Sequence, residues 1–277
     1  MRTLCPLHLR QEASAVVTTS ASYKTVSSNL TRSLSNTAAQ PQVARESKYY
    51  LANIEKVKSV DDFMKNDRLY RYAMKAFGLE DMTYAKAFMR KVLTEGVSSS
   101  TSFANTLSDP RYKEFAEAFD FAANGETTTI FDRTRQGTVD RYVRQTLEQQ
   151  AGEQNEGVRL ALYFARKAPE LTSPLGILAD KALIQVVQTA LGLPAATSAM
   201  DIDKQAEMIG KRIDVEALKD PKKLDKFINR FTAMWELSNG SGASTAGAGT
   251  LLAAQPVEAG IGADILASLQ NLKLGGR

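Results

Sequence analysis

Apolar residues recur every three or four positions from about residue 41 to residue 237. This spacing places them on one face of an α-helix and predicts a series of amphipathic helices that pack together. The best-defined helix begins at Asp67, and its apolar stripe consists of Leu69, Tyr72, Ala73, Ala76 and Phe77. Gly78 follows directly and suits the left-handed residue that ends many helices. The pattern predicts an all-α fold, an irregular multi-helix bundle with flexible termini.

Capping residues and prolines mark where further helices begin. Ser59 with Asp62 fits an N-cap followed by an acidic residue, whose charge favours the positive end of the helix dipole. Proline belongs in a first helical turn, because its missing N–H would have no partner there. Such starts occur at Asp109-Pro110, Ser173-Pro174 and Asp220-Pro221. The segment from about Thr138 to Phe164 is predicted to form one long or kinked helix.

A polar connection, Asn124 to Gly137, separates two candidate halves of this helical body, residues 41–123 and 138–237. It contains the nearest approach to a strand, Thr127 to Phe131, but the alternation there is weak. Four aromatic side chains lie on the apolar stripes and are predicted to be buried. They are Phe77, Phe119, Phe231 and Trp235.

The composition of residues 1–40 differs from that of the body. Ser, Thr, Ala and Asn dominate and acidic residues are nearly absent, so we expect a flexible polar tail that cannot bury enough apolar surface to fold alone. A cleavable transit peptide is the alternative, whereas the apolar region of a secretory signal is missing. Leu30 and Leu34 share a helix face and are candidate interaction residues. Whether residues 1–17 belong to the natural protein stays open.

A second change of composition follows Leu237. Residues 238–260 are rich in Gly, Ser and Ala and predict a flexible linker. Residues 261–277 predict a short amphipathic helix, which is too short to be stable alone and must pack on the body, on another copy or on a different protein. Its apolar stripe, a candidate interaction surface, consists of Ile261, Ile265, Leu269 and Leu272.

Charge and rare residues exclude several functions. The formal net charge is +4, and residues 1–47 account for three of these charges with five basic and two acidic residues. The folded body therefore lacks the large cationic excess typical of nucleic-acid binding. One cysteine and one histidine, Cys5 and His8, cannot supply a disulfide or a structural zinc site. No apolar run reaches the ~20 residues of a membrane span, so we expect a cytoplasmic protein.

No motif for a cofactor or metal stands out. The glycine-rich stretch from Gly240 to Thr245 follows a helix and lacks a Walker lysine, so it is interpreted as linker. Asp201 and Asp203 resemble the start of a calcium loop, but Ala206 occupies the position of the required glycine. We therefore expect no cofactor, no metal and no catalytic residue.

Three segments carry a resemblance to a known family: Ser59 to Leu79, Phe88 to Leu93 and Ser102 to Ala116. They are similar to a bacterial family known only as a domain of unknown function, over about residues 45–125 and more loosely to Leu237. Family members are helical, are sometimes built of repeated copies, and in some bacteria are encoded among flagellar genes. The resemblance implies a setting in bacterial motility and offers no catalytic residues.

Two functions of different class remain open. The first is a non-catalytic, flagellum-associated structural, assembly or chaperone-like protein, located in the cytoplasm or at the flagellum. Its partners would be proteins, flagellar components among them, and its termini would be the interaction segments. The alternative is a regulator that binds a small molecule, or an enzyme, using a cleft of carboxylate, Arg and Tyr side chains.

Overall fold

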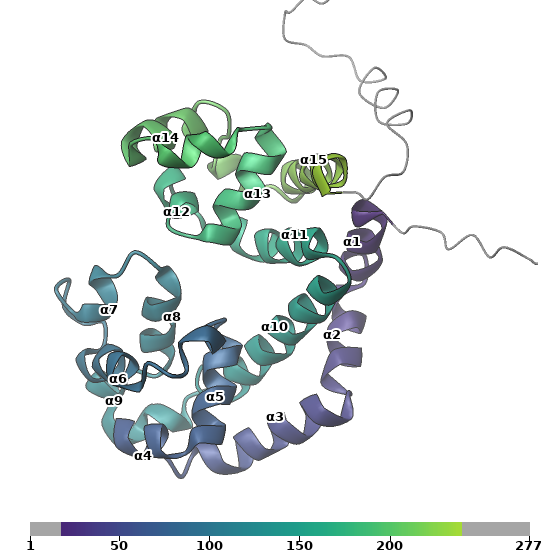
Figure 1. Ribbon diagram of the computed structural model, residues 1–277. Helices are drawn as coiled ribbons and strands as arrows, with labels where there is room; N and C mark the ends of the chain where they lie inside the picture. The colour runs from purple at the N-terminus through teal and green to yellow at the C-terminus, as the bar shows by residue number, and fades with distance from the viewer. Residues whose placement is uncertain (1–17, 240–277) are drawn as a thin grey trace, which may run out of the picture. The chain divides into compact units, whose positions relative to one another are not determined.

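The computed structural model describes residues 18–239, which form α-helices and short 3-10 helices and contain no strand (Figure 1). The all-α prediction is therefore confirmed. The described residues up to Glu236 form one compact unit. The predicted linker and C-terminal helix, residues 238–260 and 261–277, lie outside the described residues except for Ser238 and Asn239.

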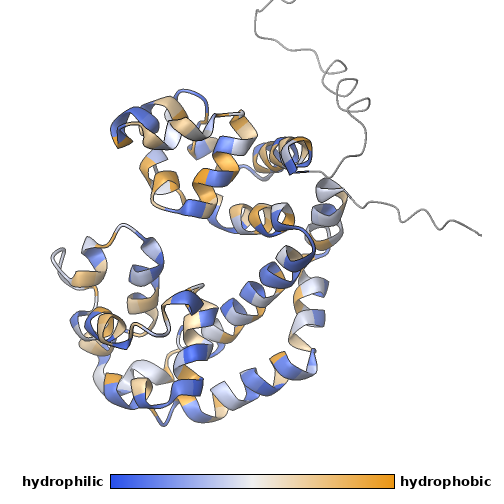
Figure 2. Ribbon diagram, in the orientation of Figure 1, coloured by the Kyte–Doolittle hydropathy of each residue, from blue (hydrophilic) through white to orange (hydrophobic). Residues whose placement is uncertain are grey.

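The α-helices are α1 (Thr19–Ser27), α2 (Leu30–Ala38), α3 (Pro41–Ile54), α4 (Val60–Lys65), α5 (Asp67–Ala76), α6 (Lys86–Glu95), α7 (Phe103–Thr106), α8 (Pro110–Ala118), α9 (Phe121–Asn124), α10 (Gln136–Gln154), α11 (Glu156–Lys167), α12 (Pro174–Leu178), α13 (Lys181–Leu191), α14 (Ile202–Gly210) and α15 (Pro221–Asn239). The 3-10 helices are η1 (Glu80–Met82), η2 (Gly125–Ile130), η3 (Ala168–Glu170), η4 (Ala195–Ala199) and η5 (Glu216–Lys219). In Figure 2 the helices carry both hydrophilic and hydrophobic residues, as amphipathic packing requires.

The predicted signals for helix starts and helix ends are confirmed at the termini of several helices. The Ser59 side chain accepts a hydrogen bond from the backbone N–H of Asp62, at 3.1 Å, and so caps α4. Asp109 and Asp220 cap α8 and α15 in the same manner, each just before a proline. Gly78 has a φ of +69° and ends α5, a conformation that other residues adopt only with strain.

The first hydrophobic core lies among α3 to α9 and the first half of α10, with buried residues from Val43 to Val143. Aromatic rings dominate it. Tyr72 stacks on both Tyr50 and Tyr142, with ring centroids 4.5 Å and 3.9 Å apart. Phe63 stacks on Phe119 at 4.9 Å. Offset ring pairs of this kind add stability beyond the burial of their area.

The second hydrophobic core lies among α11 to α15 and contains buried residues from Val158 to Phe231, together with Tyr23 of α1. Phe164 and Phe227 stack here with centroids 5.1 Å apart. The predicted burial of Phe77, Phe119 and Phe231 is confirmed, while Trp235 is half-buried and packs against this core.

A break at Asn155 separates α10 from α11. Asn155 is extended, and its side chain accepts a hydrogen bond from the N–H of Gly157 at 2.9 Å, so it caps α11. The predicted kinked helix is therefore two helices. The first core reaches Val143 and the second begins at Val158, so the cores divide within α10 and not in the predicted connection, where Thr128 and Thr129 are fully buried.

The N-terminal residues differ from the expected flexible tail. Residues 19–38 form α1 and α2, which lie against α11 and α10 respectively (Figure 1). Tyr23 enters the second core and Leu34 packs against the first. These contacts with distant parts of the chain stabilise two helices whose own sequence is mostly polar, because packing supplies most helix stability in proteins. The rest of the predicted tail, residues 1–17, lies outside the described residues.

Candidate functional site

The start of α1 and the end of α15 meet beside the α10–α11 break. Glu236 accepts hydrogen bonds from the backbone N–H of Thr19, at 2.9 Å, and from the Thr19 hydroxyl. The Asn155 amide donates to the same hydroxyl at 2.9 Å. We call Thr19, Asn155 and Glu236 the terminal junction. The Glu236 carboxylate lies at the N-terminus of α1, where the helix dipole favours a negative charge.

Trp235 secures the same region through a close contact. Its indole lies over Gly157, and a Cβ placed on that glycine would be 2.6 Å from Nε1 and 2.8 Å from Cγ of the ring. Only glycine leaves room for the ring at this distance. The last turns of α15 are therefore held against the first turn of α11.

A shallow groove of about 440 Å³ lies between α1 and α15. Tyr23, Lys24 and Ser27 line one side, and Leu224, Asp225 and Ile228 line the other. Burial raises the pKa of the Tyr23 hydroxyl above its ordinary value, while a hydrogen bond with Ser27 acts in the opposite direction. The groove is thus lined by uncharged side chains together with one lysine, Lys24, and one carboxylate, Asp225, so neither charge predominates.

A buried charged cluster joins α10 to α11. The carboxylate of Glu148, whose side chain is 2% exposed, accepts hydrogen bonds from Arg144 at 2.8 Å and from Arg166 at 2.9 Å. Lys167 donates to Glu114 of α8 at 2.6 Å and so links the two cores. Buried charges of this kind must be paired, since an unpaired one is costly to desolvate.

Tyr163 extends this cluster toward α13. Its hydroxyl donates to Asp180, and Arg166 lies over its ring at 5.0 Å. Burial and the neighbouring Asp180 carboxylate raise the pKa of Tyr163, so the hydroxyl keeps its proton. Carboxylate, Arg and Tyr groups therefore do converge in this protein, but their polar atoms bond to one another.

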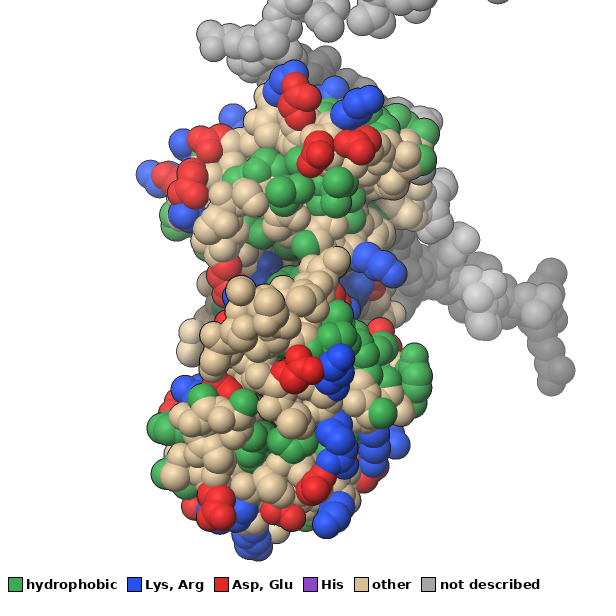
Figure 3. Space-filling view, turned by 90° about the vertical axis from the view of Figure 1, so that its left-hand side faces the viewer, with side chains coloured by type: hydrophobic (Ala, Val, Ile, Leu, Met, Phe, Trp, Pro, Cys, Tyr) green, Lys and Arg blue, Asp and Glu red, His purple; other side chains and the backbone are tan. Residues whose placement is uncertain are grey.

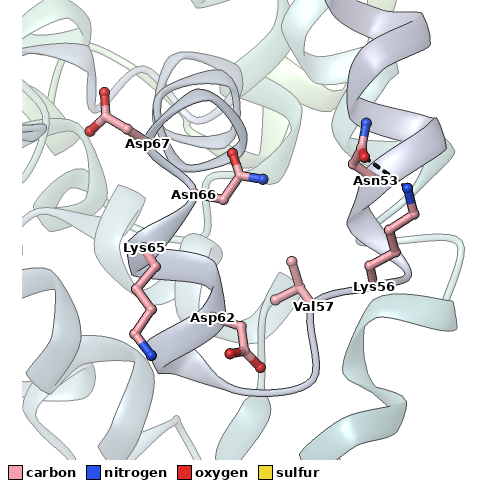
Figure 4. Close-up of a pocket in the computed structure, with 7 residues that line it drawn as sticks. All are labelled: Asn53, Lys56, Val57, Asp62, Lys65, Asn66 and Asp67. Atoms are coloured by element: carbon pink, nitrogen blue, oxygen red, sulfur yellow. Dashed lines mark hydrogen bonds between the residues drawn. The ribbon is translucent and has the colours of Figure 1, made fainter.

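A larger pocket, of about 520 Å³, lies where α3 ends and α4 and α5 begin (Figure 4). Its lining consists of Asn53, Lys56, Val57, Asp62, Lys65, Asn66 and Asp67. Several of these side chains cap or brace helices. Asn66 caps α5, and Asp67 forms an ion pair with Lys86 at 3.1 Å. The Ser59 hydrogen bond lowers the pKa of Asp62, as expected for a capping carboxylate.

Exposed hydrophobic side chains gather on one face of the second core. Figure 3 shows them bordered by acidic and basic groups in the upper part of the view, the part that contains α12 and α14. Leu175 of α12 and Ile202 of α14 are 49% and 56% exposed, and Met200 is 43% exposed. An exposed apolar surface is typical of contacts with other proteins.

The predicted interaction residues lie in different situations. Leu30 and Leu34 are half-buried on α2, and Leu34 packs against the first core, so it contributes to the body. Ile261, Ile265, Leu269 and Leu272 lie outside the described residues. The terminal junction was not predicted, because Thr19 and Glu236 are 217 residues apart in the sequence and neither carries a local signal. Within residues 18–239, no group of three or more His, Cys, Asp or Glu residues could hold a metal ion. In the same range, no helix is long and apolar enough to cross a membrane.

Comparison with known proteins identifies relatives of this chain. Residues 76–224 match a family described as "protein of unknown function (DUF1217)". The X-ray crystal structure of a protein from Agrobacterium tumefaciens is similar, with 53% sequence identity and a TM-score of 0.75. The match covers 80% of this chain and 94% of that one. No curated protein matches the chain.

Proposed function

We propose that this chain, which belongs to the DUF1217 family of proteins of unknown function, is a non-catalytic structural, assembly or chaperone-like protein that binds other proteins at the bacterial flagellum. The sequence resemblance supports the flagellar part, since similar proteins are encoded among flagellar genes in some bacteria. The terminal junction supports the binding part.

The terminal junction brings both chain ends of the body to one place. Residues 1–17 are attached to Thr18, next to Thr19. Residues 240–277 follow Asn239, the end of α15, which is three residues after Glu236. Two binding segments attached at one point raise each other's effective concentration, so that they hold a common partner more tightly than either segment alone. The C-terminal segment contains the apolar stripe Ile261, Ile265, Leu269 and Leu272, which is suited to a groove on another protein.

The test places charges on this stripe. Ile265→Asp with Leu269→Asp should abolish recovery of partners in a pull-down and impair swimming, because both charges must be desolvated when the stripe docks. The matched control is Ala263→Asp with Gln270→Asp, which adds the same charges on the opposite side of the predicted helix. The control should swim normally and retain its partners.

Truncation separates the two ends. Removing residues 1–17 leaves α1 intact, whereas removing residues 1–40 would also take Tyr23 out of the second core. If both ends hold one partner, deleting residues 1–17 and 240–277 together should weaken binding far more than either deletion alone. Normal swimming and full partner recovery in the charged stripe variant would refute the proposal and shift the function to the body.

Location in the cell distinguishes this proposal from the alternative of a small-molecule regulator or enzyme. Co-purification of the protein with flagellar basal bodies would support the proposal. A protein found apart from the basal body, with its melting temperature raised by a metabolite, would favour the alternative.

A further inference from the structure

Four cations form a stripe along the exposed side of α15, and we call them the α15 basic stripe. They are Lys222, Lys223, Lys226 and Arg230, all exposed. Since successive residues of a helix are rotated by about 100°, these four positions fall within an arc of about 100° over two turns. The opposite side of the helix contributes Ile228 and Phe231 to the second core, at 1% and 0% exposure.

The acidic residues around this stripe are engaged elsewhere. Asp220 caps α15 by accepting from the N–H groups of Lys222 and Lys223, at 2.8 Å and 3.2 Å. Asp225 accepts from the Asn229 amide at 2.9 Å, and Glu216 pairs with Lys219 at 2.6 Å. Within the described part of the chain, none of the four cations lies within ion-pair distance of a carboxylate.

Two of the cations oppose the helix dipole. Lys222 and Lys223 lie in the first turn of α15, where a positive charge meets the positive end of the dipole. The first turns of α4, α5, α11 and α14 contain acidic residues, whereas α6 and α13, like α15, have a lysine and no acidic residue there.

We propose that the α15 basic stripe binds an acidic helical segment of a partner protein. Lys222, Lys226 and Arg230 are each four residues apart, a repeat of about 6 Å along the axis. Glutamates spaced four residues apart on a second helix repeat at the same interval, so each carboxylate meets one cation. The guanidinium of Arg230 can hold its carboxylate through two parallel hydrogen bonds.

The surroundings favour a protein over other anionic partners. A membrane-surface helix buries several large apolar side chains beside its cations, but Ile228 and Phe231 of α15 are committed to the core, and Leu237 alone among the large apolar side chains of this helix is 50% exposed. Binding of single-stranded nucleic acid uses exposed aromatic rings on which bases stack, and the stripe contains none. This surface is separate from the terminal junction, and the proposal holds whatever the two chain ends bind.

The test measures binding of the full chain to a fluorescein-labelled peptide that forms a helix with glutamate at every fourth position. Replacing all four cations by glutamine should weaken binding about tenfold or more. Each exposed ion pair contributes modestly, but four such pairs are lost together. The matched control replaces four exposed lysines that have no ion pair in the structure, Lys48, Lys58, Lys65 and Lys181, and should change affinity less than about twofold. Equal losses in both variants, or no binding by the unaltered chain, would overturn the proposal.

Two further measurements complete the test. Anionic phosphatidylglycerol vesicles and single-stranded DNA should bind less tightly than the peptide, and tighter binding of either one, lost in the stripe variant, would assign the stripe to that partner instead. Lys222→Glu with Lys223→Glu should weaken peptide binding while raising the melting temperature, because the new charges favour the dipole. If this variant bound the peptide more weakly and also melted at a lower temperature, these lysines would serve the fold, and the proposal would be overturned.

Discussion

Replacing Gly157 by alanine should destabilise the protein through Trp235. The backbone of Gly157 does not have a positive φ, so alanine fits the helix itself and by propensity alone would add about 0.5–1 kcal/mol. The new Cβ, however, would lie 2.6 Å from Nε1 and 2.8 Å from Cγ of the indole. Such overpacking typically costs about 1–3 kcal/mol. We therefore expect a net loss of about 1–2 kcal/mol in the free energy of unfolding.

Removing the ring reverses the sign of this effect. In a Trp235→Leu background the added methyl group meets no indole, so Gly157→Ala should become neutral or stabilising, by up to about 1 kcal/mol. The coupling between the two sites is then about 1–3 kcal/mol, as for other pairs in direct contact. Urea unfolding followed by far-UV circular dichroism measures all four proteins of this cycle.

Fluorescence gives an independent reading. Trp235 is the single tryptophan of the chain, so selectively excited tryptophan emission comes from this ring. Gly157→Ala should displace the ring toward water and move the emission to longer wavelength. If Gly157→Ala stabilises the protein in both backgrounds and leaves the emission unchanged, this result would contradict the close contact between Gly157 and Trp235.

Three further outcomes are expected. Phe231→Ala should lower the free energy of unfolding by about 3–5 kcal/mol, because the ring is fully buried, and an unchanged urea midpoint would contradict its place in the core. Glu148→Ala should cost about 3–5 kcal/mol by leaving two arginines without their buried partner, while Glu148→Gln should cost less, and equal stability of all three proteins would refute the pairing. Burial raises the pKa of Tyr70 to about 12 and also raises that of Tyr50, whereas unfolded tyrosine titrates near 10. Their stabilisation is therefore complete below pH 10 and decreases as the pH rises toward 12, which unfolding curves at pH 8 and pH 11 with tyrosinate absorbance at 295 nm would measure.

The sequence predicts those helices whose signals are local. Ser59, Asp109 and Asp220 cap helices in the structure. This signal is local, because a cap needs only a side-chain oxygen that accepts a hydrogen bond from a backbone N–H two or three residues later. The stripe of α5 is equally local, since its residues share a face by virtue of the helical repeat. Phe231 lies on such a stripe and is buried.

What the sequence does not predict depends on distant partners. Helices α1 and α2 have few apolar residues, and Tyr23 and Leu34 anchor them to cores built from residues elsewhere in the chain. Glu148 is buried because Arg166, on the next helix, reaches back to it, and its own neighbours in sequence give no sign of this. The terminal junction depends on a contact across nearly the whole body, which no periodicity encodes.

The terminal junction also determines how the protein would respond to force. Tension applied between its two chain ends would act first on the hydrogen bonds that join Thr19 to Glu236, and then on the second core, in which Tyr23 of α1 and Phe231 of α15 are buried. A few hydrogen bonds under load part more readily than a packed core. The junction would therefore part first, and α1 and α15 would stay docked in the second core until a higher force is reached, so the protein would yield in two steps.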